Sequence, residues 1–255
     1  MQTIRIPSRF CGPPTSANGG YTAGLLARFL GGSGASIEVT LAAPIPLDVE
    51  LNVDVNGEGS TATLLSDDGI VVAARIVEVV RLNVPESVGF DRAVEASTMS
   101  PVLQPGDAHP FATCFVCGPQ RNLDDGMGLF PGEVLMNDGR SVFVAPHIPT
   151  AEFCATPFVW AALDCPSSFP MYAASEPFAG PLVLGRITAS VDGPIFAGEH
   201  YTVQAWRETV DGRKLHTAVA MFDAAANVVA TAQSVWIRVR TIEARSGAVP
   251  DSQPI

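Results

Sequence analysis

The sequence predicts an α+β fold in which antiparallel sheet makes up most of the chain. Four turn dipeptides lie between apolar runs rich in β-branched residues, as tight hairpins require: Asn56-Gly57, Asp68-Gly69, Asp138-Gly139 and Asp211-Gly212. Only two segments break this pattern with a helical period. The strand patterns that follow these two helices are alike, so we expect one βαββββ unit that occurs twice, each with a long helix wrapped by an antiparallel sheet.

The two helices are predicted from their start and stop signals. The first begins after Asn18, whose side chain can cap free backbone amides, and ends before Gly31-Gly32. The second takes Thr156 as its N-cap and Pro157 in its first turn, and Pro166 limits how far it runs straight. The flanks of this second helix carry almost no charge, which predicts a buried helix.

The elements divide the chain into two domains and a connector. We expect an N-terminal unit at residues 1–83 and a C-terminal unit at residues 113–243. Residues 84–112 are rich in proline and polar residues, which is typical of a linker, and a short helix fits around Asp91 to Ser97. Residues 244–255 carry no apolar period and are predicted to form a flexible tail.

Composition excludes several classes of protein. The chain has 255 residues, of which 47% are hydrophobic, enough for one large core or two smaller ones. Its 26 acidic residues outnumber 15 Lys and Arg, and it has no basic run, so we expect no nucleic-acid partner. No secretion signal and no run of eighteen apolar residues occurs, so we expect no membrane insertion and a cytoplasmic protein. The five cysteines are odd in number and irregularly spaced, which fits that reducing setting.

Four short motifs resemble a known family. They are Asn18-Gly19-Gly20 at a helix start, the run Cys114 to Pro119 followed by Gly126 to Leu129, Ala161 to Asp164 on the second helix, and Ala230 to Gln233 on a late strand. Together they make the chain similar to the double hot-dog acyl-CoA thioesterases, above all type II. The resemblance implies a double hot-dog fold and hydrolysis of an acyl-CoA or acyl-carrier thioester in lipid metabolism. Coenzyme A would then be part of the substrate, with no separate cofactor.

Asp164 is the leading catalytic candidate. The residues around it on the second helix are apolar on nearly every face, so its carboxylate is expected in a dry groove where its pKa rises. Such a group can orient or deprotonate water beside a bound thioester, or attack the carbonyl directly. The alternative is that Asp164 caps the segment that begins at Pro166.

The resemblance adds Gln233 and Thr188 as partners that position the water. Strand alternation places Gln233 on the same face as Val229, Val235 and Ile237, where a long amide must be hydrogen-bonded. Gln233 is therefore predicted to face Asp164, or else to bond a backbone carbonyl of the second helix. The same alternation places Thr188 away from the apolar face, so its hydroxyl faces the site only if the strand bends.

The first helix supplies the candidate oxyanion site. Glycines at the helix start in Asn18-Gly19-Gly20 would let a substrate oxygen approach amides at the positive end of the helix dipole. The alternative is an ordinary N-cap with glycines that allow close packing. This helix has no Asp or Glu, which predicts one active site per chain, in the C-terminal unit.

Cys114 and Cys117, with His109 nearby, raise the question of a metal. A four-coordinate zinc site needs further ligands, and the sequence shows no second cysteine pair or nearby histidine pair. We therefore expect both thiols to be reduced and free of metal, as small apolar side chains in a turn.

Binding of the CoA phosphates requires local positive charge. Arg238 and Arg240 at the end of the last strand, with Arg186, form the best available cluster; the alternative, the commoner fate in so acidic a chain, is that these arginines pair with surface carboxylates. Unpaired edge strands predict a homodimer.

Two alternative functions stay open. One is a protein that binds acyl-CoA or another apolar ligand without turnover. The other is a hot-dog hydratase or dehydratase, for which the second helix lacks the expected histidine.

Overall fold

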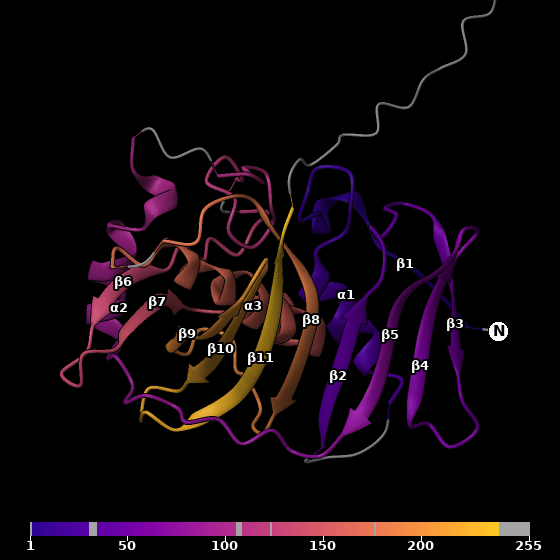
Figure 1. The fold of residues 1–255 in the computed structure, drawn as a ribbon. Coiled ribbons are helices and arrows are strands. Elements are labelled where there is room, and N and C mark those ends of the chain that lie inside the picture. Colours follow the sequence, from indigo (N-terminus) through magenta and orange to yellow (C-terminus); the bar gives the residue numbers. More distant parts are fainter. Residues whose placement is uncertain (1, 31–34, 106–108, 123, 176, 240–255) are drawn as a thin grey trace, which may run out of the picture.

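The computed structural model describes residues 2–30, 35–105, 109–122, 124–175 and 177–239. Its centre is one antiparallel sheet of eleven strands, in the order β1-β3-β4-β5-β2-β8-β11-β10-β9-β7-β6. Helices α1 and α3 lie together on one side of this sheet (Figure 1). The strands are β1 (Gln2–Arg5), β2 (Ser36–Leu41), β3 (Glu50–Val55), β4 (Thr61–Ser66), β5 (Gly69–Val77), β6 (Gly132–Leu135), β7 (Ser141–His147), β8 (Leu182–Val191), β9 (Tyr201–Asp211), β10 (Lys214–Phe222) and β11 (Val228–Arg238). The helices are α1 (Gly19–Ala27), α2 (Phe90–Thr98) and α3 (Thr156–Ser168), with short 3-10 turns at Ser8–Phe10, Pro101–Leu103, Glu152–Cys154 and Phe169–Tyr172.

The sheet consists of two units with the same topology. The first unit has the strand order β1-β3-β4-β5-β2 with α1 after its first strand, and the second has the order β7-β9-β10-β11-β8 with α3 in the corresponding place. Strand β6 is added at the outer edge of the second unit. The two units join where β2 pairs with β8, from Ile37 opposite Ala189 to Thr40 opposite Arg186. The predicted double hot-dog architecture is therefore confirmed, with one continuous sheet.

Local signals explain where the two central helices begin. The Asn18 side chain accepts a hydrogen bond of 2.8 Å from the Tyr21 N–H, so the predicted cap of α1 is present. Helix α1 ends at Ala27, earlier than expected, and the predicted stop at Gly31-Gly32 lies outside the described residues. The N-cap of α3 is Ala155 rather than Thr156, because the extended backbone already ends at Ala155.

Helix α3 continues past Pro166, which removes one backbone donor. The hydroxyls of Ser167 and Ser168 donate to the carbonyl oxygens of Asp164 and Cys165 at 2.7 and 2.8 Å, within the last turn of the helix. The prediction that the proline limits the straight helix is thus correct only for the last turn.

Two glycines allow α1 and α3 to approach closely. A Cβ on Gly20 would collide with the Asp164 side chain, and a Cβ on Gly24 would lie 2.6 Å from the Cα of Pro157. The spacing of four residues places both glycines on one face of α1. Close contact between the two units therefore depends on this glycine face.

The first part of the predicted connector, up to α2, covers the opposite side of the second unit. Ala93 of α2, together with Val88, packs in a separate apolar cluster against β7, β9 and β10. The observed helix matches the short one expected around Asp91 to Ser97. No helix in the described segments is long and apolar enough to span a bilayer.

Gly24→Ala tests the helix contact. Helix propensity alone favours alanine by about 1 kcal/mol, but the added methyl meets the backbone of Pro157. We expect the free energy of unfolding to fall by about 1–3 kcal/mol in urea denaturation. Gly57→Ala is the control, because Gly57 has open space around it and is expected to change stability by less than about 0.5 kcal/mol. Equal stability of the two variants would contradict close packing at Gly24.

His147 predicts a stability loss in acid. This side chain at the end of β7 is buried, and burial lowers its pKa from 6.5 to about 4. The unfolded chain therefore takes up a proton between pH 6.5 and pH 4 that the folded chain refuses, so stability falls as the pH drops through this window. We expect wild type to lose about 3 kcal/mol more than His147→Gln between pH 7 and pH 4. Parallel pH profiles in chemical denaturation would show that His147 does not titrate this way.

Candidate active site

A cavity of about 390 Å³ lies where the two units meet. Its walls come from the start of α1, the second half of α3, the adjoining ends of β8 and β11, and the segment around Cys114. Most of the lining is apolar, as in pockets that hold small organic ligands. Asp164 is the carboxylate among the lining residues.

Asp164 is held between the two units. Its side chain is 2% exposed, and its Oδ2 accepts a hydrogen bond of 2.7 Å from the Gly20 N–H at the start of α1. Its other oxygen, Oδ1, is buried and has no hydrogen-bond partner among the described residues. Burial raises the pKa of Asp164 to about 7, and the Cys114 thiol acts in the same direction, whereas the Gly20 N–H and the Asn18 side chain act in the opposite direction. The carboxylate therefore has one fixed oxygen and one oxygen that can accept a proton near neutral pH.

The backbone N–H groups at the start of α1 donate to different acceptors. The Tyr21 N–H bonds the Asn18 side chain, and the Gly20 N–H bonds Asp164. Within the described chain, the Gly19 N–H has no acceptor, and Gly19 lines the cavity. Of the three residues predicted to form an oxyanion site, Gly19 thus offers a free amide, while Gly20 holds the carboxylate and Asn18 caps the helix.

A buried polar group supports α3 from the sheet. Ser234 on β11 is fully buried, and its hydroxyl lies 3.0 Å from that of Ser167 on α3. The indole N–H of Trp236 donates to the same Ser167 hydroxyl at 2.9 Å. These contacts show which side chains of β11 face the helix: Ser234 and Trp236.

The prediction that Gln233 faces Asp164 is therefore wrong. Successive residues of a strand point to opposite faces, so Gln233 points away from α3. Thr188 lies opposite Gln233 in the register of β8 and β11, and the neighbouring pair, Ile187 and Ser234, faces the helix. Neither Gln233 nor Thr188 lines the cavity. The strand does not bend at Thr188 in the way that its predicted role required.

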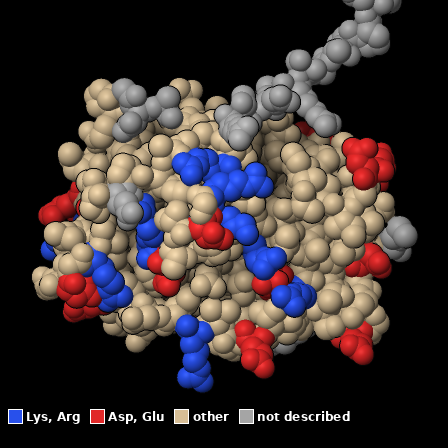
Figure 2. Space-filling view, viewed as in Figure 1, with Lys and Arg blue, Asp and Glu red and all other residues tan. Residues whose placement is uncertain are grey.

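Two of the three predicted arginines, Arg186 and Arg238, lie on the outer face or at the strand end, where each side chain has other partners. Arg186 forms an ion pair with Glu38 at 3.5 Å and donates to Thr40 at 3.2 Å. The guanidinium of Arg238 lies 4.4 Å from the ring centre of Phe178 and donates to two carbonyl oxygens. Figure 2 shows a row of basic side chains across this face of the sheet. Arg240 lies outside the described residues, and phosphate binding by this cluster stays a prediction.

Three cysteines meet at the wall of the cavity. The thiols of Cys114, Cys117 and Cys165 are buried, and their sulfur atoms all lie within 4.8 Å of one another. Hydrogen bonds from Cys117 and Cys165 lower the pKa of Cys114 well below its ordinary value, whereas burial opposes that change. The same sharing raises the pKa values of the other two thiols. The sequence places only His109 close to the cysteine pair along the chain, and the fold adds a third thiol, Cys165 of α3.

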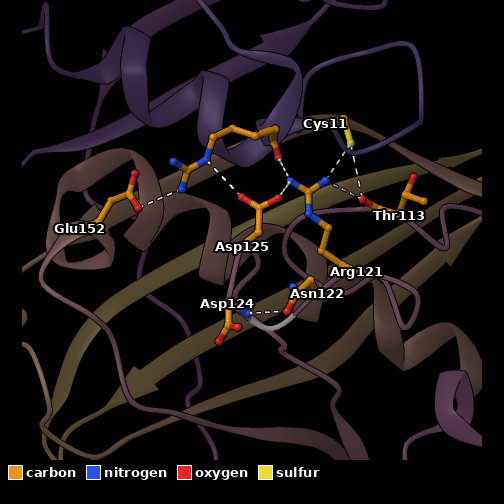
Figure 3. Close-up of polar contacts among 8 residues, drawn as sticks. Cys11, Thr113, Arg121, Asn122, Asp124, Asp125 and Glu152 are labelled. Carbon is orange, nitrogen blue, oxygen red and sulfur yellow. Dashed lines mark hydrogen bonds and ion pairs between the residues drawn. The ribbon is translucent and has the colours of Figure 1, made fainter.

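An arginine network attaches the cysteine segment to the first unit (Figure 3). Asp125 lies between two guanidinium groups, with a distance of 2.6 Å to Arg121 and 3.6 Å to Arg9. Arg121 also donates to the backbone carbonyl of Arg9 at 2.6 Å, and Arg9 pairs with Glu152 at 2.9 Å. These contacts hold the segment that contains Cys114 against the residues that precede α1.

Sequence reasoning missed two side chains near the site. Ser234 lies two residues before Trp236, so both side chains are on the same face of β11. The sequence does not show which face of β11 meets the helix, because small and apolar residues occur on both faces. Cys165 directly follows Asp164, but nothing local indicates that it meets Cys114, 51 residues earlier. His109 was named, and the structure places it in the cavity lining.

The comparisons with known proteins agree with this architecture. No protein-family model matches the sequence, and a search of curated proteins finds no match. Among solved structures, the chain is similar to the TesB protein of Mycobacterium avium subspecies paratuberculosis, with a TM-score of 0.58, 12% identity, and coverage of 93% of this chain and 92% of the other. An acyl-CoA thioesterase II from Mycobacterium marinum matches with a TM-score of 0.53, 10% identity, and the same coverage.

A dehydratase domain has a comparable match. The dehydratase domain of PpsC from Mycobacterium tuberculosis, solved with C12:1-CoA, has a TM-score of 0.57 and 12% identity over 93% of this chain and 92% of that domain. At such identities the similarity shows the fold. The chain is thus a double hot-dog protein, with the fold that thioesterases and dehydratase domains share.

Ser234→Ala compared with Gln233→Ala tests the orientation of β11. Ser234→Ala removes a buried hydroxyl next to Ser167, and we expect a loss of about 1 kcal/mol in unfolding free energy. Gln233→Ala affects the opposite face and is expected to change stability by less than about 0.5 kcal/mol. The reverse order in guanidinium denaturation would place Gln233, rather than Ser234, against α3.

Proposed function

We propose that this protein hydrolyses an acyl thioester, with Asp164 as the base that activates water. The observation that carries the proposal is the state of its carboxylate at the wall of an apolar cavity: Oδ2 is fixed by the Gly20 N–H, and Oδ1 is buried with no hydrogen-bond partner in the described part of the chain. A buried polar atom normally has a hydrogen-bond partner. A water molecule between Oδ1 and a bound thioester would supply that partner.

The reaction then follows from the arrangement of these groups. Asp164 takes a proton from water while the water oxygen attacks the carbonyl carbon of the thioester. The free Gly19 N–H, at the positive end of α1, is the candidate donor to the oxygen that becomes negatively charged. The carbon–sulfur bond breaks, the leaving thiolate receives the proton from Asp164, and the products are a carboxylic acid and a thiol.

The cavity and the strand end suggest how the substrate would lie. A cavity of about 390 Å³ with mostly apolar walls suits an acyl group. Arg238 directly follows Ile237, which lines the cavity, so we keep Arg238 as the candidate for the phosphate end of a CoA carrier. The proposal includes neither Gln233 nor Thr188, since both point to the other face of the sheet.

One observation favours a second candidate function, hydration or dehydration of an acyl thioester. By resemblance to hot-dog hydratases and dehydratases, this reaction would use an aspartate paired with a histidine. The second helix alone does not supply that histidine. The structure brings His109 to the same cavity as Asp164, and burial lowers the pKa of His109, which leaves a neutral ring that can act as a base. Release of thiol from acyl-CoA and loss of the conjugated double bond of 2-enoyl-CoA distinguish the two reactions.

Asp164→Asn tests the proposal in a thiol-release assay over acyl-CoA chain lengths. The amide keeps an oxygen for the Gly20 N–H but cannot take a proton, so turnover should fall by at least about a hundredfold with the fold intact. Gln233→Ala is the matched control and should retain turnover within about twofold of wild type, because Gln233 lies outside the cavity.

Two outcomes would contradict the proposal. If Asp164→Asn keeps wild-type turnover, Asp164 is not the base. If wild type releases no thiol from any acyl-CoA yet binds one, the protein is a binding protein; if it instead hydrates 2-enoyl-CoA, the second candidate is correct.

A further inference from the structure

The three thiols at the cavity wall have the spacing of a metal site. Cys114 and Cys165 have their sulfur atoms 3.6 Å apart. Two thiolates on one tetrahedral zinc ion, each about 2.3 Å from the metal, lie about 3.8 Å apart. All three sulfur atoms fall within 4.8 Å of one another, so small side-chain movements would bring them to one ion.

The turn that carries the first two thiols has a shape suited to this role. A Cβ on Gly118 would lie 2.5 Å from both the carbonyl oxygen of Ala112 and the backbone nitrogen of Cys114, so only glycine fits after Cys117. The backbone amides of Val116 and Cys117 also lower the pKa of the Cys114 thiol, after the larger effect of the two neighbouring thiols. Amide donors of this kind stabilise a thiolate and orient it for a metal.

The third thiol has its own support. The Asn18 side-chain amide donates to the Cys165 sulfur at 3.3 Å, from the cap of α1. Asn18 therefore contacts a candidate ligand from the opposite unit, as residues surrounding metal ligands commonly do. An ordinary buried cysteine does not require such a hydrogen bond to its sulfur atom.

His109 is the candidate for a fourth ligand through its contact with Cys117; it lies outside the group of atoms within 4.8 Å of one another, so its segment must move toward Cys114 and Cys165 when the ion binds. Its Nε2 lies 3.4 Å from the Cys117 sulfur, and an imidazole nitrogen and a thiolate on one zinc ion lie about 3.6 Å apart. Its Nδ1 accepts a hydrogen bond from the Phe111 N–H at 3.0 Å. Binding of a metal through Nε2 places the proton on Nδ1, so this contact must be replaced when the ring binds the ion.

From this geometry, and in place of the metal-free thiols expected from the sequence, we infer that Cys114, Cys117 and Cys165 bind one Zn²⁺ ion, with His109 as the fourth ligand. Three thiolates and one imidazole form a common closed zinc site, and soft sulfur ligands favour zinc over magnesium or calcium. The ion would link the segment around Cys114 to α3, directly beside Asp164. It would be a structural ion that fixes one wall of the cavity, and it takes no part in the proposed hydrolysis.

Elemental analysis of the intact chain, purified under reducing conditions and reconstituted with Zn²⁺, tests this inference. We expect about one zinc ion per chain after removal of loosely bound metal. Replacement by Co²⁺ should give the visible absorption of a tetrahedral thiolate site. Cys117→Ser and Cys165→Ser should each lose most of the zinc, because each removes a ligand near the others. His109→Ala removes the fourth ligand but leaves the three thiols. We expect this variant to release zinc to a chelator about tenfold faster than wild type does.

Cys154→Ser is the matched control, because Cys154 lies outside the cluster and should keep the wild-type zinc content. Circular dichroism of each variant separates loss of the metal from loss of the fold. The inference is overturned if the reconstituted wild type holds no zinc, if zinc stays bound in folded Cys117→Ser and Cys165→Ser, or if Cys114 and Cys165 form a disulfide instead. The measurement does not depend on turnover, so it stands apart from the outcome for Asp164.

Discussion

The hydrogen bond between the Gly20 N–H and the Asp164 carboxylate links the two halves of this molecule at the point where its chemistry is proposed. It joins the start of one central helix to the middle of the other, across 144 residues of sequence. A free helix start attracts a negative charge, and a buried carboxylate needs a donor, so each group satisfies a requirement of the other. The contact also orients the carboxylate, since Oδ2 is bonded while Oδ1 has no hydrogen-bond partner in the segments that the structure describes.

This hydrogen bond requires the helices to lie close together, and the sheet makes that possible. Because β2 pairs with β8, one continuous sheet carries α1 and α3 side by side on the same face. Glycines on α1 then remove the side chains that would separate the helices. The cavity forms beyond this contact, where the start of α1 and the second half of α3 meet the ends of two strands. Two units with the same topology thus form an asymmetric site, with the carboxylate from one half and the helix start from the other.

Much of this arrangement could be predicted from local patterns. Hairpin signals, two helical segments and the repeated order of elements were sufficient for the double architecture, and the apolar surroundings of Asp164 indicated its burial. The face occupied by Gln233 could not be predicted in this way. In β11, small residues such as Ala232 and Ser234 alternate with larger ones, so hydrophobicity does not fix which set faces the helix. Cys165 was missed for another reason: its approach to Cys114 is a tertiary contact, and spacing along the chain carries no signal for it.

The most direct measurement is the structure of the intact protein with a non-hydrolysable acyl-CoA analogue. The account predicts that the acyl chain fills the cavity between the units, that the carbonyl oxygen or its substitute lies within hydrogen-bond distance of the Gly19 N–H, and that a water molecule bonds Asp164 Oδ1. An analogue bound on the outer face of the sheet beside Gln233, Thr188 and Arg186, with the cavity filled only by side chains or solvent, would contradict it.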